Sequence, residues 1–137
     1  RAAVEEGVLP GGGAALLYAK DSITFNDDDS EDIKLGKKIV HSALSSPFIQ
    51  ILENAGYTDP TWYLYELSKM EGTWFGYDLK SESFVNMEDE GILDPTKVTR
   101  LAIENAAAVA GTILTTESVI HEEPSNKKEE ETPNLGF

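Results

Sequence analysis

Apolar side chains recur at helical spacing through most of this sequence. The clearest stripe runs from Glu31 to Ser45, where the apolar residues fall on one side and three lysines on the other. The same periodicity predicts four further helices, at residues 14–20, 47–54, 60–70 and 95–114. Residues 1–6 have the composition of the last turns of a helix, which is expected to end at Gly7 in a left-handed conformation. We therefore expect a mainly α-helical fold.

Three of these helices are expected to begin at a proline that follows a capping side chain. The three pairs are Ser46-Pro47, Asp59-Pro60 and Asp94-Pro95. Serine and aspartate accept hydrogen bonds from the free N–H groups of a first turn, and proline at the first helical position loses no bond that the helix needs. We expect the side chain before each proline to be the N-cap.

Two segments have the β-branched and aromatic residues that are typical of strands. Residues 73–78 and 83–86 flank a polar centre and predict a small hairpin, which needs support from helices. Val119 and Ile120 follow the last helix and are expected to form a short terminal strand. The predicted fold class is thus mainly α, with a small β-hairpin and a short terminal strand.

Composition and charge limit the classes of function. The chain has 137 residues, 40% of them apolar, and a net charge of −14. Residues 124–137 are expected to be a disordered acidic tail, which leaves 1–123 as the folded part. Because like charges repel at long range, neither nucleic acid nor a membrane surface is expected as a partner. With no cysteine and two histidines, the spacing predicts no metal site and no catalytic triad.

The glycines Gly11, Gly12 and Gly13 are the first candidate for binding chemistry. Glycine lets a backbone turn through otherwise forbidden dihedral angles and come close to a ligand, so a phosphate site is physically reasonable. The sequence has neither a Walker A motif nor a dinucleotide fingerprint. From the residues alone, a sharp turn between two helices is the favoured interpretation, and the resemblance described next reverses that weighting.

Two stretches of the chain closely resemble the group I chaperonins, the bacterial and organellar chaperone family. The first is residues 1–16, RAAVEEGVLPGGGAAL. The second is residues 91–100, GILDPTKVTR, with the alanine-rich segment and the Leu-Thr-Thr-Glu that follow it. The resemblance extends from Arg1 to about Ile120 and implies that the chain is the C-terminal half of an equatorial domain.

The resemblance also implies which residues bind ATP. Gly12 matches the glycine whose backbone meets the nucleotide, and Asp94 matches the aspartate that accepts hydrogen bonds from the ribose hydroxyls. Asp78, Leu79 and Lys80 match the segment that flanks the adenine. The family usually has small residues where Leu79 and Lys80 stand, so crowding of the adenine is expected there.

A group I chaperonin is an ATP-driven protein-folding machine, and its properties are what the resemblance implies for the parent protein. Two stacked rings of seven identical subunits are expected, with a co-chaperonin and unfolded clients bound through other domains. The resemblance puts the magnesium-binding segment and the aspartate that activates water outside this chain, so we expect no ATP hydrolysis by the chain alone. The chain closes without Gly-Gly-Met repeats, which favours an organelle, plastid stroma or mitochondrial matrix, over a bacterial cytoplasm.

Three interpretations remain open at this point. The chain is either part of a chaperonin or a stand-alone helical module for protein interactions; an independent small nucleotide-binding protein is a third class. Trp62, Trp74, Phe75 and Tyr77 are expected to be buried or at subunit contacts rather than stacked on bases. If half of a domain is missing, exposed apolar patches and self-association are also expected.

Overall fold

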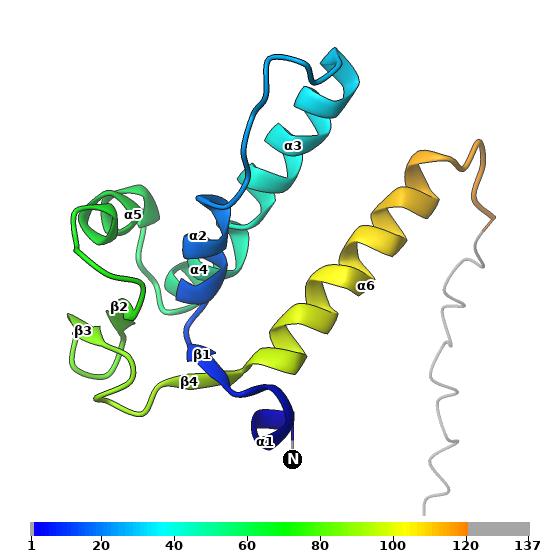
Figure 1. The fold of residues 1–137 in the computed structure, drawn as a ribbon. Helices are drawn as coiled ribbons and strands as arrows, with labels where there is room; N and C mark the ends of the chain where they lie inside the picture. The colour runs from blue at the N-terminus through cyan, green and yellow to red at the C-terminus, as the bar shows by residue number, and fades with distance from the viewer. Residues whose placement is uncertain (1, 121–137) are drawn as a thin grey trace, which may run out of the picture.

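The computed structural model describes residues 2–120, which form six helices and four short strands (Figure 1). In chain order these are α1 Ala2–Glu6, β1 Val8–Pro10, α2 Ala14–Lys20, α3 Glu31–Ala43, α4 Ser46–Asn54, α5 Pro60–Ser68, β2 Phe75–Asp78, β3 Ser83–Asn86, β4 Leu93–Pro95 and α6 Thr96–Leu114. The mainly α fold is confirmed, and so is the left-handed Gly7, at φ 80°. The predicted tail, residues 124–137, lies outside the described residues.

The strands form two separate antiparallel pairs. Strands β2 and β3 make the predicted hairpin, with Phe75 opposite Asn86 and Asp78 opposite Ser83. Strands β1 and β4 make a second pair, in which Leu9 lies opposite Asp94. The sequence did not predict this second pair, because each strand has three residues and ends in a proline.

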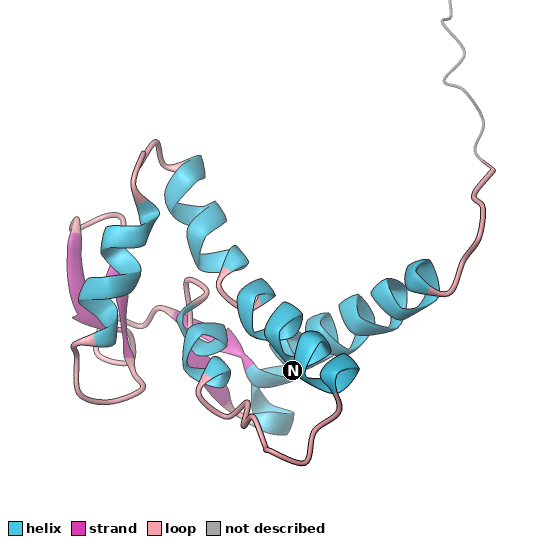
Figure 2. Cartoon of the chain, turned by 90° about the horizontal axis from the view of Figure 1, so that it is seen from above, coloured by secondary structure: helices cyan, strands magenta, loops and turns pink. Residues whose placement is uncertain are grey.

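The core is small and lies between α4, α5 and the hairpin. Phe48, Leu52 and Leu67 are almost fully buried at its centre. Packed around them are Leu17, Tyr57, Tyr63, Leu64, Met70, Phe75, Tyr77, Leu79 and Phe84. Seen from above, α5 lies beside the hairpin at one end of the molecule (Figure 2), and it contacts β2. Helix packing thus supplies the support that a two-stranded hairpin requires.

Helices α3 and α6 extend away from this core (Figure 1). Neither helix has a buried residue. The apolar stripe predicted on α3 is therefore exposed, with Ile39 58% accessible, and on α6 Ile113 is 63% accessible. Exposed apolar patches were expected, and the structure confirms them on both helices.

The predicted caps need correction. Helix α5 begins at Pro60, as predicted, and α4 begins at Ser46, one residue before its predicted start, but neither helix has a side-chain cap. Asp94 is not an N-cap, because the chain continues as strand β4 and α6 begins only at Thr96. Ser30 does cap: its side chain accepts a hydrogen bond from the Ile33 N–H at 3.3 Å.

The predicted terminal strand was wrong. Val119 and Ile120 have no regular secondary structure and are 76% and 98% exposed. Two β-favouring residues form a strand only when a partner strand can pair with them, and none in residues 2–120 does so.

Candidate functional site

The pairing of β1 with β4 joins the glycine loop to the segment that contains Asp94. The Gly11 N–H donates to the Ile92 carbonyl at 2.8 Å, and the Thr96 N–H donates to the Gly7 carbonyl at 3.1 Å. These bonds close both ends of the pair. Two segments that are far apart in the sequence thereby form one structural unit.

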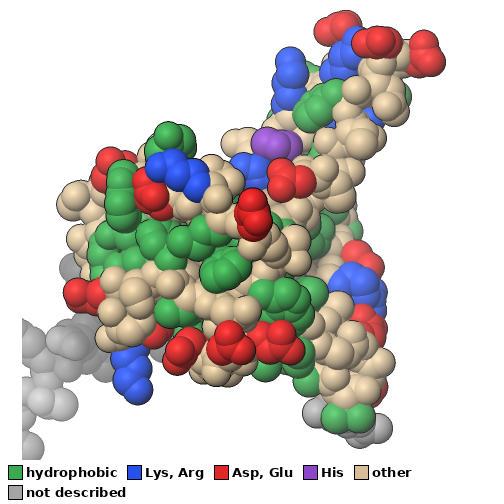
Figure 3. All heavy atoms as spheres, turned by 60° about the vertical axis from the view of Figure 1, so that its left-hand side comes forward, with side chains coloured by type: hydrophobic (Ala, Val, Ile, Leu, Met, Phe, Trp, Pro, Cys, Tyr) green, Lys and Arg blue, Asp and Glu red, His purple; other side chains and the backbone are tan. Residues whose placement is uncertain are grey.

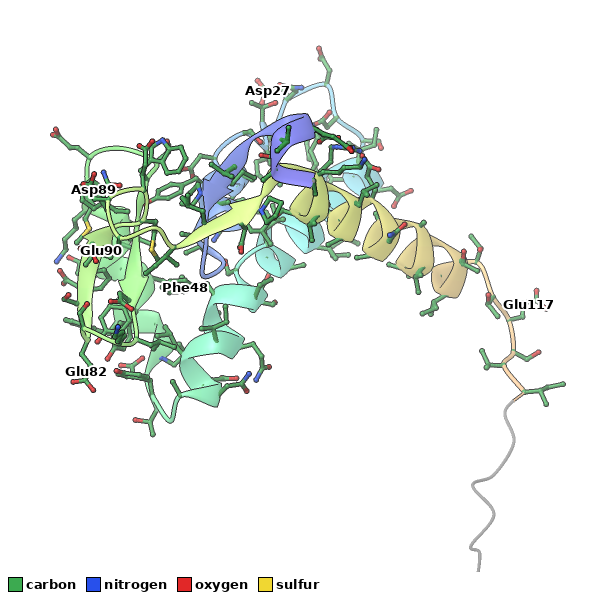
Figure 4. The ribbon with its side chains drawn as sticks, turned by 90° about the horizontal axis from the view of Figure 1, so that it is seen from below. Asp27, Phe48, Glu82, Asp89, Glu90 and Glu117 are labelled. Carbon is green, nitrogen blue, oxygen red and sulfur yellow. The ribbon has the colours of Figure 1, made fainter. Side chains whose placement is uncertain are left out.

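The glycine loop requires glycine at all three positions, and at Gly11 the reason is that a β-carbon would lie 2.9 Å from the Ile92 carbonyl oxygen. Gly12 and Gly13 have φ angles of 64° and 79°, in the left-handed region. A β-carbon on Gly13 would lie 2.7 Å from the backbone nitrogen of Phe48, which is labelled beside this loop in Figure 4. A β-carbon on Gly12 would meet only the Met87 methyl, at 3.4 Å. Gly13 is therefore fixed by packing, whereas Gly12 is less crowded.

Asp94 is half-buried in the middle of β4. Within residues 2–120, no hydrogen bond or ion pair engages its carboxylate. A carboxylate that is neither a helix cap nor an ion-pair partner keeps its acceptor capacity for a ligand.

Asp78 has a different environment, at the turn of the hairpin. Its carboxylate accepts hydrogen bonds from the Lys80 N–H at 2.9 Å, the Ser81 N–H at 3.1 Å and the Ser81 hydroxyl at 2.6 Å. The Ser81 hydroxyl, followed by the backbone donors, holds the pKa of Asp78 below its usual value. The carboxylate is thus occupied by the turn. Any ligand contact from this residue is left to its backbone.

The neighbours of Asp78 have separate roles. The Leu79 side chain packs against the core, and Lys80 is exposed. Figure 4 shows Glu82 at the hairpin turn, with Asp89 and Glu90 at the opposite end of the hairpin. The structure therefore joins Gly12 and Asp94 through one strand pair and leaves Asp78, Leu79 and Lys80 on a separate element.

Met87 connects the hairpin to the glycine loop, and the sequence did not identify it. Its side chain is fully buried, and its methyl group is the nearest atom to the positions of β-carbons on both Gly12 and Gly76. Its N–H donates to the Trp74 carbonyl and its carbonyl accepts from the Ile92 N–H, each at 2.8 Å. No spacing rule signals such a residue, because its contacts depend on the tertiary fold.

Ion pairs connect α1 to α6 across the β1–β4 pair. Arg100 binds Glu6 through two nitrogens, at 2.7 and 3.1 Å, and also binds Glu104 at 2.8 Å. Lys97 pairs with Glu5. The Arg100 guanidinium lowers the pKa of Glu6. These exposed pairs orient α6 relative to the glycine loop but contribute little to stability.

Five aromatic rings cluster where α5 meets the hairpin. They belong to Tyr57, Trp62, Tyr63, Tyr77 and Phe84. Hydrogen bonding to the Tyr57 and Tyr63 hydroxyls, together with burial, raises the pKa of Tyr77. The expected burial is only partial: Trp74, Phe75 and Tyr77 are half-buried, the last two against the core, whereas Trp62 is 50% exposed.

Two absences among residues 2–120 bear on chemistry. No three acidic, histidine or cysteine side chains come together as a metal site in that range. Nor does any helix there have both the length and the hydropathy needed to span a membrane.

Comparison with known proteins identifies the family. A sequence model of the TCP-1/cpn60 chaperonin family matches residues 1–124. The chain belongs to the TCP-1/cpn60 chaperonin family. A crystal structure of a group III chaperonin in the open state is similar to it, with 31% identity and a TM-score of 0.77 over 87% of this chain.

That match covers 25% of the group III chain, so this chaperonin chain spans about a quarter of it. The likeness extends over the glycine loop, the hairpin and β4, because those elements lie within the family match. Family membership accounts for the fold. The expectation that the chain is of group I stays a prediction.

Proposed function

We propose that this chain forms one wall of the ATP site of a longer, group I chaperonin subunit that assists protein folding. The observation that carries the proposal is the β1–β4 pair, which joins the glycine loop to the half-buried Asp94 carboxylate, to which no other described residue is bonded. Family membership and the share of the group III chain that is covered support the view that the site belongs to a larger subunit.

The residues of this wall have distinct tasks. Gly12 has no side chain, so its backbone can approach a phosphate closely, while the Asp94 carboxylate accepts hydrogen bonds from the ribose hydroxyls. The segment from Asp78 to Lys80 flanks the adenine through its backbone. Because Leu79 packs against the core, its side chain is already engaged, which supports this arrangement despite its size.

Hydrolysis requires groups from elsewhere in the subunit. Bound ATP with Mg²⁺ supplies the phosphoanhydride bond and the metal that neutralises phosphate charge. We propose that other segments of the parent hold this metal and activate the attacking water. By itself, this chain then binds nucleotide without turning it over.

The assembly we propose is a seven-membered ring of identical subunits in an organelle. Other domains of the subunit would bind the co-chaperonin and unfolded clients. Exposed apolar residues on α3 and α6 are consistent with surfaces that pack against further parts of the subunit.

Isothermal titration of ATP with magnesium into the purified chain tests the proposal. We expect saturable binding that is lost in Gly12→Val and Asp94→Ala. Two controls should keep it: Asp89→Ala removes an exposed acid, and Gly56→Val repeats the left-handed strain at a position with no atom within 4 Å. Binding that survives both site variants contradicts the assigned residues.

Absence of any saturable binding contradicts a preformed nucleotide wall. It would favour the alternative, a helical interaction module. That function would use the exposed apolar faces of α3 and α6.

A further inference from the structure

A hollow with unusual chemistry lies at the connection between α4 and α5. It has a volume of about 350 Å³ and is lined by Gly56, Tyr57, Thr58, Asp59, Trp62 and Tyr63. Half of these residues are aromatic and one is a carboxylate. None belongs to the proposed nucleotide wall, so the hollow needs an explanation of its own.

The aromatic rings around the hollow stand at steep angles to one another. The ring centres of Tyr57 and Tyr63 are 5.2 Å apart with 80° between the ring planes, and those of Trp62 and Tyr63 are 4.8 Å apart with 90° between the planes. Edge-to-face packing of this kind leaves ring faces that point in different directions. The faces of aromatic rings carry negative partial charge and attract cations.

The positions of these rings are well supported from beneath. The Tyr77 ring of strand β2 has its centre 4.7 Å from that of Tyr63 and 5.8 Å from that of Tyr57. The hairpin therefore holds the two inner rings. Trp62 is the outer ring, 50% exposed and therefore accessible to a partner. The hollow thus combines a fixed floor with an open aromatic side.

Charge around the hollow also favours a cation. Asp59 is exposed, and within residues 2–120 no side chain pairs with its carboxylate. Gly56 and Tyr57 follow the C-terminal end of α4, which is the negative end of its dipole. The carboxylate of Asp59 offsets the positive end of α5. A net charge of −14 adds long-range attraction for a basic partner.

We propose that the hollow lined by Tyr57, Asp59 and Trp62 receives the ammonium or guanidinium group of a lysine or arginine side chain from a partner protein. Trp62 offers the broadest ring face, and Asp59 pairs with the charge at the rim. Helix α5 already carries one contact of this type, with Lys69 Nζ 4.0 Å from the centre of the Tyr65 ring. Figure 3 views the molecule from the side of α5 and the hairpin, where hydrophobic side chains gather and acidic side chains lie at the edges.

A matched pair of small probes tests this site. Nα-acetyl-lysine-N-methylamide carries the ammonium group, and the norleucine analogue has the same stem without the charge. We expect saturable NMR shifts of the Trp62 indole and the Tyr57 and Tyr63 rings, with the lysine probe binding about fivefold more tightly. The arginine analogue should bind at the same residues.

Variants separate the proposed contacts from general surface effects. Asp59→Asn should weaken binding of the lysine probe several-fold and leave binding of the norleucine probe unchanged. Trp62→Leu should abolish the preference for the lysine probe, followed through the Tyr57 and Tyr63 signals. Tyr65→Leu removes an exposed aromatic ring from the same helix but outside the hollow, and should have no effect.

Equal binding of the two probes overturns the proposal, and so does a lysine preference that survives Trp62→Leu. Because Trp62 is half exposed, its replacement should leave the fold intact, which far-UV circular dichroism checks. Should Trp62→Leu unfold the chain, Trp62→Phe keeps a smaller ring and must still show a reduced preference. None of these readouts depends on ATP binding.

Discussion

The methyl group of Met87 occupies the space that a side chain on Gly76 would need. A β-carbon on Gly76 would lie 2.1 Å from Met87 Cε and 3.0 Å from its Cγ. Met87 is fully buried, so its side chain has little room to move aside. Because the same methyl group lies beneath Gly12, this contact joins the hairpin to the glycine loop.

Gly76→Ala should therefore lower the free energy of unfolding by about 2 kcal/mol, as overpacking of a filled core does. Urea unfolding measures the change. Gly36→Ala is the control, because Gly36 lies within α3 with no atom within 4 Å of its β-carbon position, and alanine there should stabilise by about 0.5 kcal/mol. Equal effects of the two substitutions would contradict the packing argument.

Gly13→Ala should lower the free energy of unfolding by about 3 kcal/mol, because it combines left-handed backbone strain with a clash against the Phe48 backbone. Gly56→Ala isolates the strain, since φ there is 89° and no atom lies within 4 Å. We expect it to cost about 1 kcal/mol. The difference between the two variants in chemical denaturation measures the clash, and a difference near zero would show that Phe48 yields easily.

Asp78 should make the free energy of unfolding depend on pH in the acid range. Its pKa is lowered in the folded chain, so its contribution is present above the unfolded pKa of about 3.9 and is lost as pH falls through the lower folded value. NMR titration of the Asp78 carboxyl should show the low pKa. Ser81→Ala removes the hydroxyl whose hydrogen bond is the largest cause of the lowered pKa, so the pKa of Asp78 should move back toward its usual value. An unchanged pKa would contradict this hydrogen bond as the cause.

Ser30→Ala should lower the free energy of unfolding by about 1 kcal/mol, through loss of the bond to the Ile33 N–H. Ser46→Ala is the comparison, because Ser46 lies inside α4 and caps nothing. Alanine there should be neutral or slightly stabilising. Amide exchange in the first turn of each helix checks both expectations, and equal protection losses would restore Ser46 as a cap.

Local patterns predicted most of the helices because helix periodicity depends on neighbours within two turns. Residues 14–20 and the hairpin strand 83–86 have the predicted bounds. Asp94 shows the limit of this reasoning. An Asp-Pro pair looks the same whether a helix begins there or a strand ends there, and only the distant Leu9 decides between them.

The candidate site was accessible from the sequence only through the family resemblance. Gly12 and Asp94 came from matched motifs, and their roles in ATP binding stay predictions. What the resemblance did not provide was Met87, whose contacts exist only once the hairpin and the glycine loop have met. The turn that occupies the Asp78 carboxylate depends on Ser81, outside the matched motif.

The strand pair that joins the glycine loop to Asp94 also sets an order of folding. Leu9 and Asp94 lie 85 positions apart, whereas α4, α5 and the hairpin form contacts among residues that are close in sequence. Closing so long a loop costs chain entropy before any contact compensates for it. During synthesis, the glycine loop emerges from the ribosome before β4 and stays without its partner strand until β4 follows. We therefore expect the hairpin and its helices to fold first and the proposed nucleotide wall to form last.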